Sequence, residues 1–339
     1  MRIDYVNWRH GGRHAANYIG DGGAPDYGEL LRLMSVGAWP GVLALGEADR
    51  YRFNGGQCTW EAIAALRSVG SPPYQPLWGR LPDRGGPFAP MLLVDPTQII
   101  VNRWYDDLLP DAAARTDNTL LATDVSSGVQ FRLVVVHLDI HNGDERLREV
   151  RRFDRFSRHD APTFLVGDFN STPSGPWVPD DLNDPRVDWL PMQRSYRALF
   201  QHGPAQGGPL VHDTRALDYL IGYWKSPCVL ARLLASLRHR RVDGRRVGGL
   251  GYLDVAEMAC DYTPTQHPRV NGSAPRAVDR MLVNQLAAGA YVPGSYTVFP
   301  PLDPTRPDAD SDHKRITAEF DLSSPQLERI ALMTGLPHG

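Results

Sequence analysis

Short apolar segments that end in polar residues recur along the whole chain. Runs of this kind, rich in Val, Leu and Phe, predict β-strands. In the last of them, every second residue from Ile316 to Leu322 is apolar, the period of a strand with only one face buried. Segments with helical periodicity are fewer, so a mixed or antiparallel sheet is expected. The predicted strands are 42–45, 91–94, 131–138, 163–166, 281–283 and 316–322, and the predicted helices are 29–35, 59–69 and 144–156.

Composition sets outer limits on what the chain can be. With 339 residues and 42% hydrophobic content it can bury one large core, although the length alone also permits two domains. A formal net charge of -3 and a pI near 6.4 exclude the chain-wide basic field of a non-specific DNA coat. Any attraction to phosphate groups must therefore be local.

The cysteines and the first residues bear on the cellular compartment. The three cysteines have unrelated spacings and form no CxxC pair, which predicts reduced thiols rather than a zinc site or a disulfide scaffold. The sequence after Met1 becomes polar and glycine-rich by residues 10–12, too early for an export signal or a membrane anchor. A cytoplasmic location is therefore expected.

Two segments differ from the rest of the chain. Residues 167–191 are rich in Gly and Pro and predict long loops. Residues 225–247 combine an apolar stripe with clustered arginines, including Arg240 and Arg241. We interpret them as a basic insertion whose arginines bind substrate, or alternatively as a solvated helix face with a polar tail. We expect a catalytic domain over 1–323, followed by a C-terminal helix and tail over 324–339.

The strongest local motif lies at the end of the predicted strand 163–166. Asp168 and Asn170 are two positions apart and are expected to project toward the same side. A carboxylate can orient or deprotonate a water molecule, while an amide can donate a hydrogen bond to a phosphate oxygen. This pairing suits phosphoryl transfer, although a strand-ending Asx turn is an equally good explanation of the motif alone.

Other polar residues also stand at strand ends. Asp312 and His313 precede the final strand, where an imidazole that titrates near neutrality could handle protons. Glu47 follows the strand 42–45, where its carboxylate could bind a hard cation such as Mg²⁺. His137 ends an apolar run and could equally be a hydrogen-bonded core residue. Taken singly, Asp312–His313 also fits a solvated surface pair, and Glu47 a turn glutamate.

Two more residues complete the set. Asp279 lies inside an apolar strand, where an unpaired carboxylate would cost several kcal/mol, so we expect it to have a partner. Asp218 is a second candidate for this strand aspartate, but Asp279 is favoured by its position near the final strand. Asn7 follows a predicted first strand over 3–6, and could bind near a metal ion or cap a turn.

The order of these elements is Asn, Glu, His, Gly-Asp-Phe-Asn, a strand Asp, and Ser-Asp-His before a terminal strand. In this order they resemble the endonuclease/exonuclease/phosphatase superfamily, the deoxyribonuclease I-like enzymes. The resemblance spans about residues 1–322, and its specific parts are 167–170 and 311–313. The chain departs from the family pattern around Asn7, in Arg280 after Asp279, and in the insertion.

The resemblance implies an α/β (α+β) fold, a four-layer sandwich in which two packed mixed β-sheets are flanked by helices and the site lies at one end. It also implies roles for the motif residues. Glu47, Asn7 and Asp312 would bind Mg²⁺ or Mn²⁺. Asp168 and Asn170 would position the water and the phosphate. His313, oriented by Asp279 or Asp312, would activate the water or bind phosphate, and His137 would stabilise the transition state or protonate the leaving oxygen.

These observations predict a divalent-metal-dependent phosphodiester hydrolase, a nuclease that acts on DNA. Because the superfamily shares one core among several activities, a phosphatase or a lipid or phosphoinositide phosphodiesterase is an alternative. A non-catalytic binding module on the same fold is the alternative from another class. The arginines of the insertion favour nucleic acid, because they can neutralise backbone phosphates. The glycine clusters do not form a P-loop or a dinucleotide-binding fingerprint.

Overall fold

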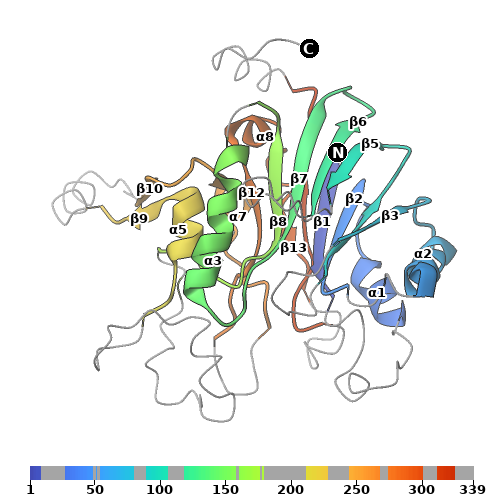
Figure 1. The fold of residues 1–339 in the computed structure, drawn as a ribbon, viewed down its shortest axis with the longest axis horizontal. Coiled ribbons are helices and arrows are strands. Elements are labelled where there is room, and N and C mark those ends of the chain that lie inside the picture. Colours follow the sequence, from blue (N-terminus) through green and yellow to red (C-terminus); the bar gives the residue numbers. More distant parts are fainter. Residues whose placement is uncertain are drawn as a thin grey trace.

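Two six-stranded β-sheets pack face to face, with helices on the outer face of each (Figure 1). The structure is a computed structural model. It describes residues 1–8, 27–48, 51, 54–79, 89–105, 118–157, 160–175, 178, 211–227, 244–267, 274–300 and 311–324.

The first sheet joins the two ends of the described chain. Its strand order is β13 (Thr297–Val298), β14 (Ile316–Glu319), β1 (Arg2–Asn7), β2 (Val42–Gly46), β4 (Met91–Val94) and β3 (Gln75–Trp78). Strands β1 and β2 are parallel and the other neighbours are antiparallel, so the sheet is mixed.

The second sheet is also mixed. Its strand order is β11 (Leu253–Asp254), β12 (Asp279–Val283), β8 (Thr163–Asp168), β7 (Gln130–His137), β6 (Thr119–Asp124) and β5 (Ile99–Tyr105). Strands β7 and β8 are parallel and the other neighbours are antiparallel.

Helices complete the four layers. Helices α1 (Tyr27–Met34) and α2 (Gln57–Ser68) bury apolar side chains against the outer face of the first sheet. Helices α3 (Gly143–Val150) and α5 (Arg215–Ile221) do the same on the second sheet. The shorter elements are η3 (Asn54–Gly56), η5 (Arg151–Phe156), α7 (Val255–Met258), α8 (Gln285–Gly289), and the pair β9 (Tyr223–Lys225) and β10 (Arg245–Val247). The predicted four-layer sandwich is confirmed.

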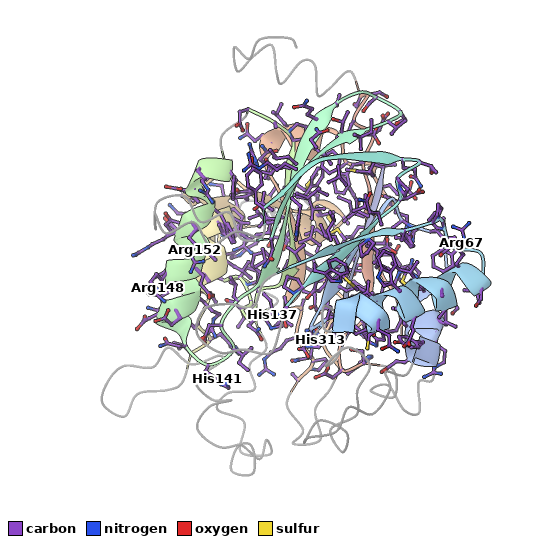
Figure 2. The ribbon with its side chains drawn as sticks, turned by 45° about the vertical axis from the view of Figure 1, so that its right-hand side comes forward. Arg67, His137, His141, Arg148, Arg152 and His313 are labelled. Carbon is purple, nitrogen blue, oxygen red and sulfur yellow. The ribbon has the colours of Figure 1, made fainter. Side chains whose placement is uncertain are left out.

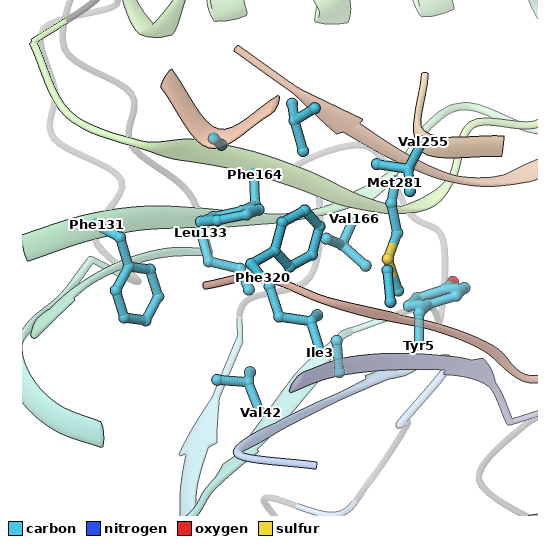
Figure 3. Close-up of a cluster of buried hydrophobic side chains, with 14 of the residues drawn as sticks. Ile3, Tyr5, Val42, Phe131, Leu133, Phe164, Val166, Val255, Met281 and Phe320 are labelled. Carbon is cyan, nitrogen blue, oxygen red and sulfur yellow. The ribbon is translucent and has the colours of Figure 1, made fainter. Parts of the chain in front are cut away.

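The main core lies between the sheets and follows from the period of two along each strand. Alternate side chains of a strand face the opposite sheet, as Ile3 and Tyr5 of β1 do, while Val6 faces the helices. Phe164 of β8 packs edge-on against Phe320, with ring centroids 4.7 Å apart (Figure 3). The space between the sheets is therefore filled with apolar side chains up to the strand ends.

All six strands predicted from apolar runs are present. The predicted helix 144–156 is divided into α3 and the 3-10 helix η5. The loop predicted from Gly167 begins later, because β8 continues to Asp168. The insertion predicted over 225–247 begins and ends in the two-stranded sheet, and its residues 228–243 lie outside the described residues, as do residues 325–339 of the predicted C-terminal helix and tail.

The described residues include two of the three cysteines. Cys58 and Cys260 are free thiols, whereas Cys228 lies outside the described residues. Among the helices that the structure describes, none is long and apolar enough to cross a membrane.

Candidate functional site

The inward-facing row of side chains on four strands changes from apolar to polar at the same end of the sandwich. On β1 it continues from Tyr5 to Asn7, and on β8 from Val166 to Asp168. The same parity places His137 at the end of β7 and Asp279 at the start of β12. Strand periodicity thus directs all four polar side chains into the mouth of the inter-sheet core.

Strand register brings three of these residues into one row. Asp168 on β8 pairs with His137 on β7 and with Asp279 on β12. Paired residues of neighbouring strands project to the same face of a sheet. Asp168 is 2% exposed and Asp279 0%, whereas His137 is half-buried.

His313 reaches this row from the segment before β14. The Ser311 hydroxyl donates to the Asn7 carbonyl at 2.7 Å, which ties the segment to the end of β1. The His313 Nδ1 atom then lies 2.8 Å from Asp279 Oδ2. Of the two partners predicted for His313, Asp279 is therefore the one that holds the ring. Figure 2 shows His313 and His137 close together at the lower end of the sheets.

Amides hold the Asp168 carboxylate from two sides. Asn7 Nδ2 donates to Asp168 Oδ2 at 3.1 Å, and the Asn170 backbone N–H donates to Asp168 Oδ1 at 2.7 Å. The Asn170 side chain donates to the Leu138 carbonyl at 3.0 Å, directly after His137. The residues around Asn7 depart from the family pattern, but Asn7 itself contacts Asp168 of the Gly-Asp-Phe-Asn motif.

Glu47 and Asp312 lie at the margin of this cluster, and both are half-buried. Glu47 follows β2 directly, and the Trp8 N–H donates to the Gly46 carbonyl at 3.1 Å, so the ends of β1 and β2 are joined. Glu47 has a φ of 52° and Asn170 one of 45°, a left-handed conformation that costs energy in residues other than glycine. Such backbone strain is concentrated at functional sites.

Burial and mutual repulsion change the proton affinities of the cluster. Burial, followed by the negative charge of Asp279, raises the pKa of Asp168 to about 7. Burial alone would lower the pKa of His313, but the charge and hydrogen bond of Asp279 raise it to about 10. At neutral pH, His313 is therefore an imidazolium, and Asp168 is poised to exchange a proton.

His137 has the opposite electrostatic character. Burial lowers the pKa of His137, the charge of Glu47 opposes that change, and His313 adds to it. A neutral imidazole at the mouth of the core can donate a hydrogen bond, but it carries no positive charge.

The donor set of the site fits a hard divalent cation. Asp168, Asp279 and His313 bring two carboxylates and one imidazole together, with an oxygen or nitrogen atom of each within 4.8 Å of the others. As an imidazolium His313 contributes charge, so the oxygens are the atoms that could bind a cation. Asn7 Oδ1 and Asp279 Oδ1 are buried and have no hydrogen-bond partner within the described part of the chain. Buried oxygens without partners are costly, and Mg²⁺ and Mn²⁺ prefer oxygen ligands. A bound cation is the kind of partner that such oxygens lack.

Three further residues contact this site, and none of them was predicted as a site residue. Thr265 Oγ1 accepts hydrogen bonds from the backbone N–H groups of Val278 and Asp279, at 3.1 and 3.0 Å. Gln266 Nε2 lies 3.4 Å from His313 Nε2. The hydroxyl of Tyr5 is buried below Asn7. Tyr5 lies two residues before Asn7, so strand periodicity could have predicted that both side chains face the site. No local sequence pattern distinguishes Gln266.

Other predicted residues lie elsewhere. Asp218, the second candidate for the strand aspartate, lies in α5, where it accepts hydrogen bonds from the backbone and hydroxyl of Ser174 and from Thr214. It is therefore not part of the site. Arg240 and Arg241, predicted to bind substrate, lie outside the described residues.

The two mixed sheets, their helices and this terminal row define a deoxyribonuclease I-like fold, as the order of the motifs predicted. Among solved structures, the chain is similar to a humanized D. rerio TDP2 carrying 14 mutations, with 14% identity, coverage of 95% of this chain and 98% of that chain, and a TM-score of 0.50. The D. rerio TDP2 complex with a single-strand DNA product has the same values. The 3′ phosphatase NExo from Neisseria bound to a product DNA hairpin has 16% identity, coverage of 95% and 99%, and a TM-score of 0.49.

At the level of sequence no such likeness was found. No family model matches the chain, and no curated protein matches it. The similarity to TDP2 is therefore a similarity of fold, and function has to be inferred from the site.

Proposed function

We propose that the protein is a divalent-metal-dependent phosphodiester hydrolase that acts on DNA as a nuclease. The observation that carries this proposal is the buried cluster of Asp168, Asp279 and His313, with one side-chain oxygen or nitrogen atom of each within 4.8 Å of the others. It lies beside Asn7 at the mouth of a deoxyribonuclease I-like sandwich. A carboxylate that titrates near neutrality next to an imidazolium suits the attack of water on phosphorus.

The pKa differences support specific roles for the two central residues. With its pKa raised to about 7 by burial and by Asp279, Asp168 can accept a proton from the attacking water. His313, held charged by Asp279, would stabilise the negative charge that develops on the phosphoryl oxygens. Two groups whose environments move their pKa values apart commonly divide acid–base work in this way.

The amide and the second imidazole would position the phosphate. Asn170 donates one side-chain hydrogen to Leu138, which fixes the amide and leaves its second N–H available for a phosphate oxygen. His137, kept neutral by burial, would donate a hydrogen bond to a phosphoryl oxygen or to the leaving oxygen. We expect both hydrogen bonds to the phosphate to form without movement of the strand ends that carry Asn170 and His137.

Glu47, Asn7 and Asp312 are the residues proposed to hold Mg²⁺ or Mn²⁺. Asn7 Oδ1 is buried and accepts no hydrogen bond from the described residues, which supports its assignment as a ligand. When bound, the cation would supply positive charge to the phosphoryl oxygens.

Two considerations favour DNA as the substrate. The D. rerio TDP2 structure with this fold was determined with a single-strand DNA product. The basic insertion over 225–247 could neutralise backbone phosphates. The cytoplasmic location stays a prediction from the sequence.

One assay tests the activity and its substrate class. Purified protein with Mg²⁺ is incubated with plasmid, single-stranded DNA, RNA, a phosphoinositide and a phosphomonoester. We expect cleavage of DNA that stops in excess chelator and returns with Mg²⁺ or Mn²⁺. Cleavage of the phosphoinositide or the phosphomonoester alone would assign the chain to the alternative activities. No turnover of any substrate would favour a binding module.

The catalytic assignment predicts large effects of single substitutions. Asp168→Ala and His313→Ala should each lower turnover by at least about a hundredfold, the scale of losing one catalytic group. Asp160→Ala is the control, because this carboxylate is exposed and its ion pair among the described residues is with Arg132. Near-normal turnover in either folded site variant would contradict the assignment.

The insertion gives a separate prediction about binding. Replacing Arg240 and Arg241 together with Ala should weaken DNA binding and reduce the slope of log affinity against log salt by about 2, one for each lost phosphate contact. A matched double variant of the exposed Arg148 and Arg151 controls for the change in net charge. An unchanged salt slope in the first variant would remove this argument for nucleic acid.

A further inference from the structure

The hydroxyl of Tyr5 is a buried polar group for which the described residues provide no well-formed hydrogen bond. Tyr5 is 0% exposed, and its hydroxyl makes no well-formed hydrogen bond within the described part of the chain, although a weak one from the backbone of Asp168 partly offsets the rise in its pKa. Buried tyrosine hydroxyls usually find a partner. In this protein Tyr74 donates to the Pro40 carbonyl at 2.8 Å and Tyr252 to the Phe153 carbonyl at 2.9 Å. Tyr5 is therefore an exception that packing alone does not explain.

The Tyr5 hydroxyl lies at the floor of the candidate site. Tyr5 and Asn7 are two residues apart on β1, so their side chains share the inward face of the strand. A Cβ atom added to Gly46 would overlap the Tyr5 hydroxyl and lie 3.3 Å from Asn7 Oδ1. Both oxygens therefore converge on the space beside Gly46, directly before Glu47.

The surroundings of this hydroxyl are negatively charged. After burial, the charges of Asp279, Asp168 and Glu47 are the main causes that raise the pKa of Tyr5 well above its usual value. A phenol next to oxygens can donate its proton to one of them in a hydrogen bond, and it can also accept a hydrogen bond. Tyr5 Oη, Asn7 Oδ1 and Asp279 Oδ1 together make a group of oxygens that protein atoms of the described residues leave unsatisfied.

We propose that Tyr5 is a positioning residue for the divalent cation, its hydroxyl donating a hydrogen bond to an oxygen that the cation binds. This inference rests on the proposed function, because it requires that a cation occupies the mouth of the core. Hydrogen bonds of this kind orient the ligands of metal ions, and their loss typically weakens metal affinity about 10- to 100-fold.

The test is Tyr5→Phe, which removes one oxygen atom and keeps the ring. Mn²⁺ binding is measured by calorimetry and by the rise in Tm with Mn²⁺ concentration. We expect Mn²⁺ affinity to fall about 10- to 100-fold, while the metal-free Tm stays equal or rises, because an unsatisfied buried hydroxyl has been removed. Tyr74→Phe is the matched control and should do the reverse, lowering the metal-free Tm without changing Mn²⁺ affinity.

The outcomes separate the two proposals. If the wild-type protein binds Mn²⁺ and Tyr5→Phe binds it equally well, this inference is overturned and the proposed function stands. A fall in the metal-free Tm of Tyr5→Phe that matches the fall for Tyr74→Phe would reveal a structural hydrogen bond and would also overturn the inference. If the wild-type protein binds no divalent cation, the metal-dependent function itself fails.

Discussion

Asp168 combines burial, two hydrogen bonds and a like-charged neighbour. It is 2% exposed, accepts hydrogen bonds from Asn7 and Asn170, and pairs in register with Asp279. Burial and the charge of Asp279 raise its pKa from 3.8 to about 7. Between these values the folded state binds the proton more tightly than the unfolded chain. The stability that this proton contributes is present below pH 3.8 and is lost as the pH rises toward 7.

Asp168→Asn should therefore stabilise the metal-free protein at pH 8 and abolish most of its activity. The new amide still accepts from the Asn170 N–H through its oxygen, and Asn7 can rotate its side chain to accept from the new NH₂ group. We expect Tm in chelator to exceed that of the wild type at pH 8, with little gain at pH 4. Equal Tm differences at the two pH values would contradict the raised pKa.

At the residue scale, sequence reasoning found the polar residues that follow apolar strands. Asp168, Asn170, His137 and Glu47 were visible because each ends a clear apolar run. Their proximity depends on strand register, such as the pairing of Asp279 with Asp168 across 111 positions of sequence, which no local pattern encodes. Gln266 was missed for this reason, since only the fold brings it to His313.

Ion pairs and hydrogen bonds around Asp213 link the start of α3 to the segment that follows β8. Arg146, fully buried in α3, lies 3.5 Å from Asp213 Oδ2, and Arg215 donates to both Asp213 oxygens at 2.9 and 3.0 Å. The Ser171 hydroxyl, next to Asn170, donates to the Asp213 carbonyl at 2.9 Å. A Cβ atom on Gly143 would overlap Asp213 Oδ2, so the start of α3 requires a glycine here. The network therefore connects a helix start to a residue of the site.

Asp213→Ala should destabilise the fold by about 3 kcal/mol, because it removes the carboxylate that compensates the buried charge of Arg146. Asp144→Ala is the matched control, since its side chain is 80% exposed and it also pairs with Arg215. That control should change stability by no more than about 0.5 kcal/mol. Urea unfolding of the two variants measures the difference, and similar losses in both would refute this role of Asp213.

At the element scale, prediction succeeded where strands are buried on both faces. All five residues of β12 are buried, and so are all six of β8. The apolar runs within them, 281–283 and 164–166, made both strands predictable. Strands β3 and β5 at the edges of the sheets were missed, because exposed and polar residues interrupt their pattern. Helix α5 was missed because its seven residues are too few to establish a helical period.

The molecule as a whole depends on the core between the two sheets. Phe164 of the second sheet contacts Phe320, next to the end of β14, and also Phe131, with centroids 4.7 and 5.9 Å apart. The site takes residues from both sheets, because Asn7 belongs to the first, Asp168 and Asp279 belong to the second, and His313 precedes β14. The geometry of the site therefore depends on how the sheets pack.

Phe164→Ala should lower the free energy of unfolding by about 3–5 kcal/mol, the usual cost of a cavity left by a buried aromatic ring. Ile100→Ala, at a position that is 52% exposed, should change it by less than about 0.5 kcal/mol. Denaturant unfolding measures both. A loss below about 1 kcal/mol for Phe164→Ala would show that the core between the sheets relaxes around the missing ring.

The position of β14 between β13 and β1 has a consequence for the synthesis of the protein. The first strand pairs with β2 on one side and gains its second neighbour only with residues Ile316–Glu319. His313 is held through Ser311, which bonds the Asn7 carbonyl, and through the carboxylate of Asp279. A growing chain in which residue 313 has not yet been synthesised contains Asn7, Asp168 and Asp279 but lacks the imidazole of His313. On the proposed function, a chain that is still being translated is therefore expected to be inactive toward the nucleic acids around it.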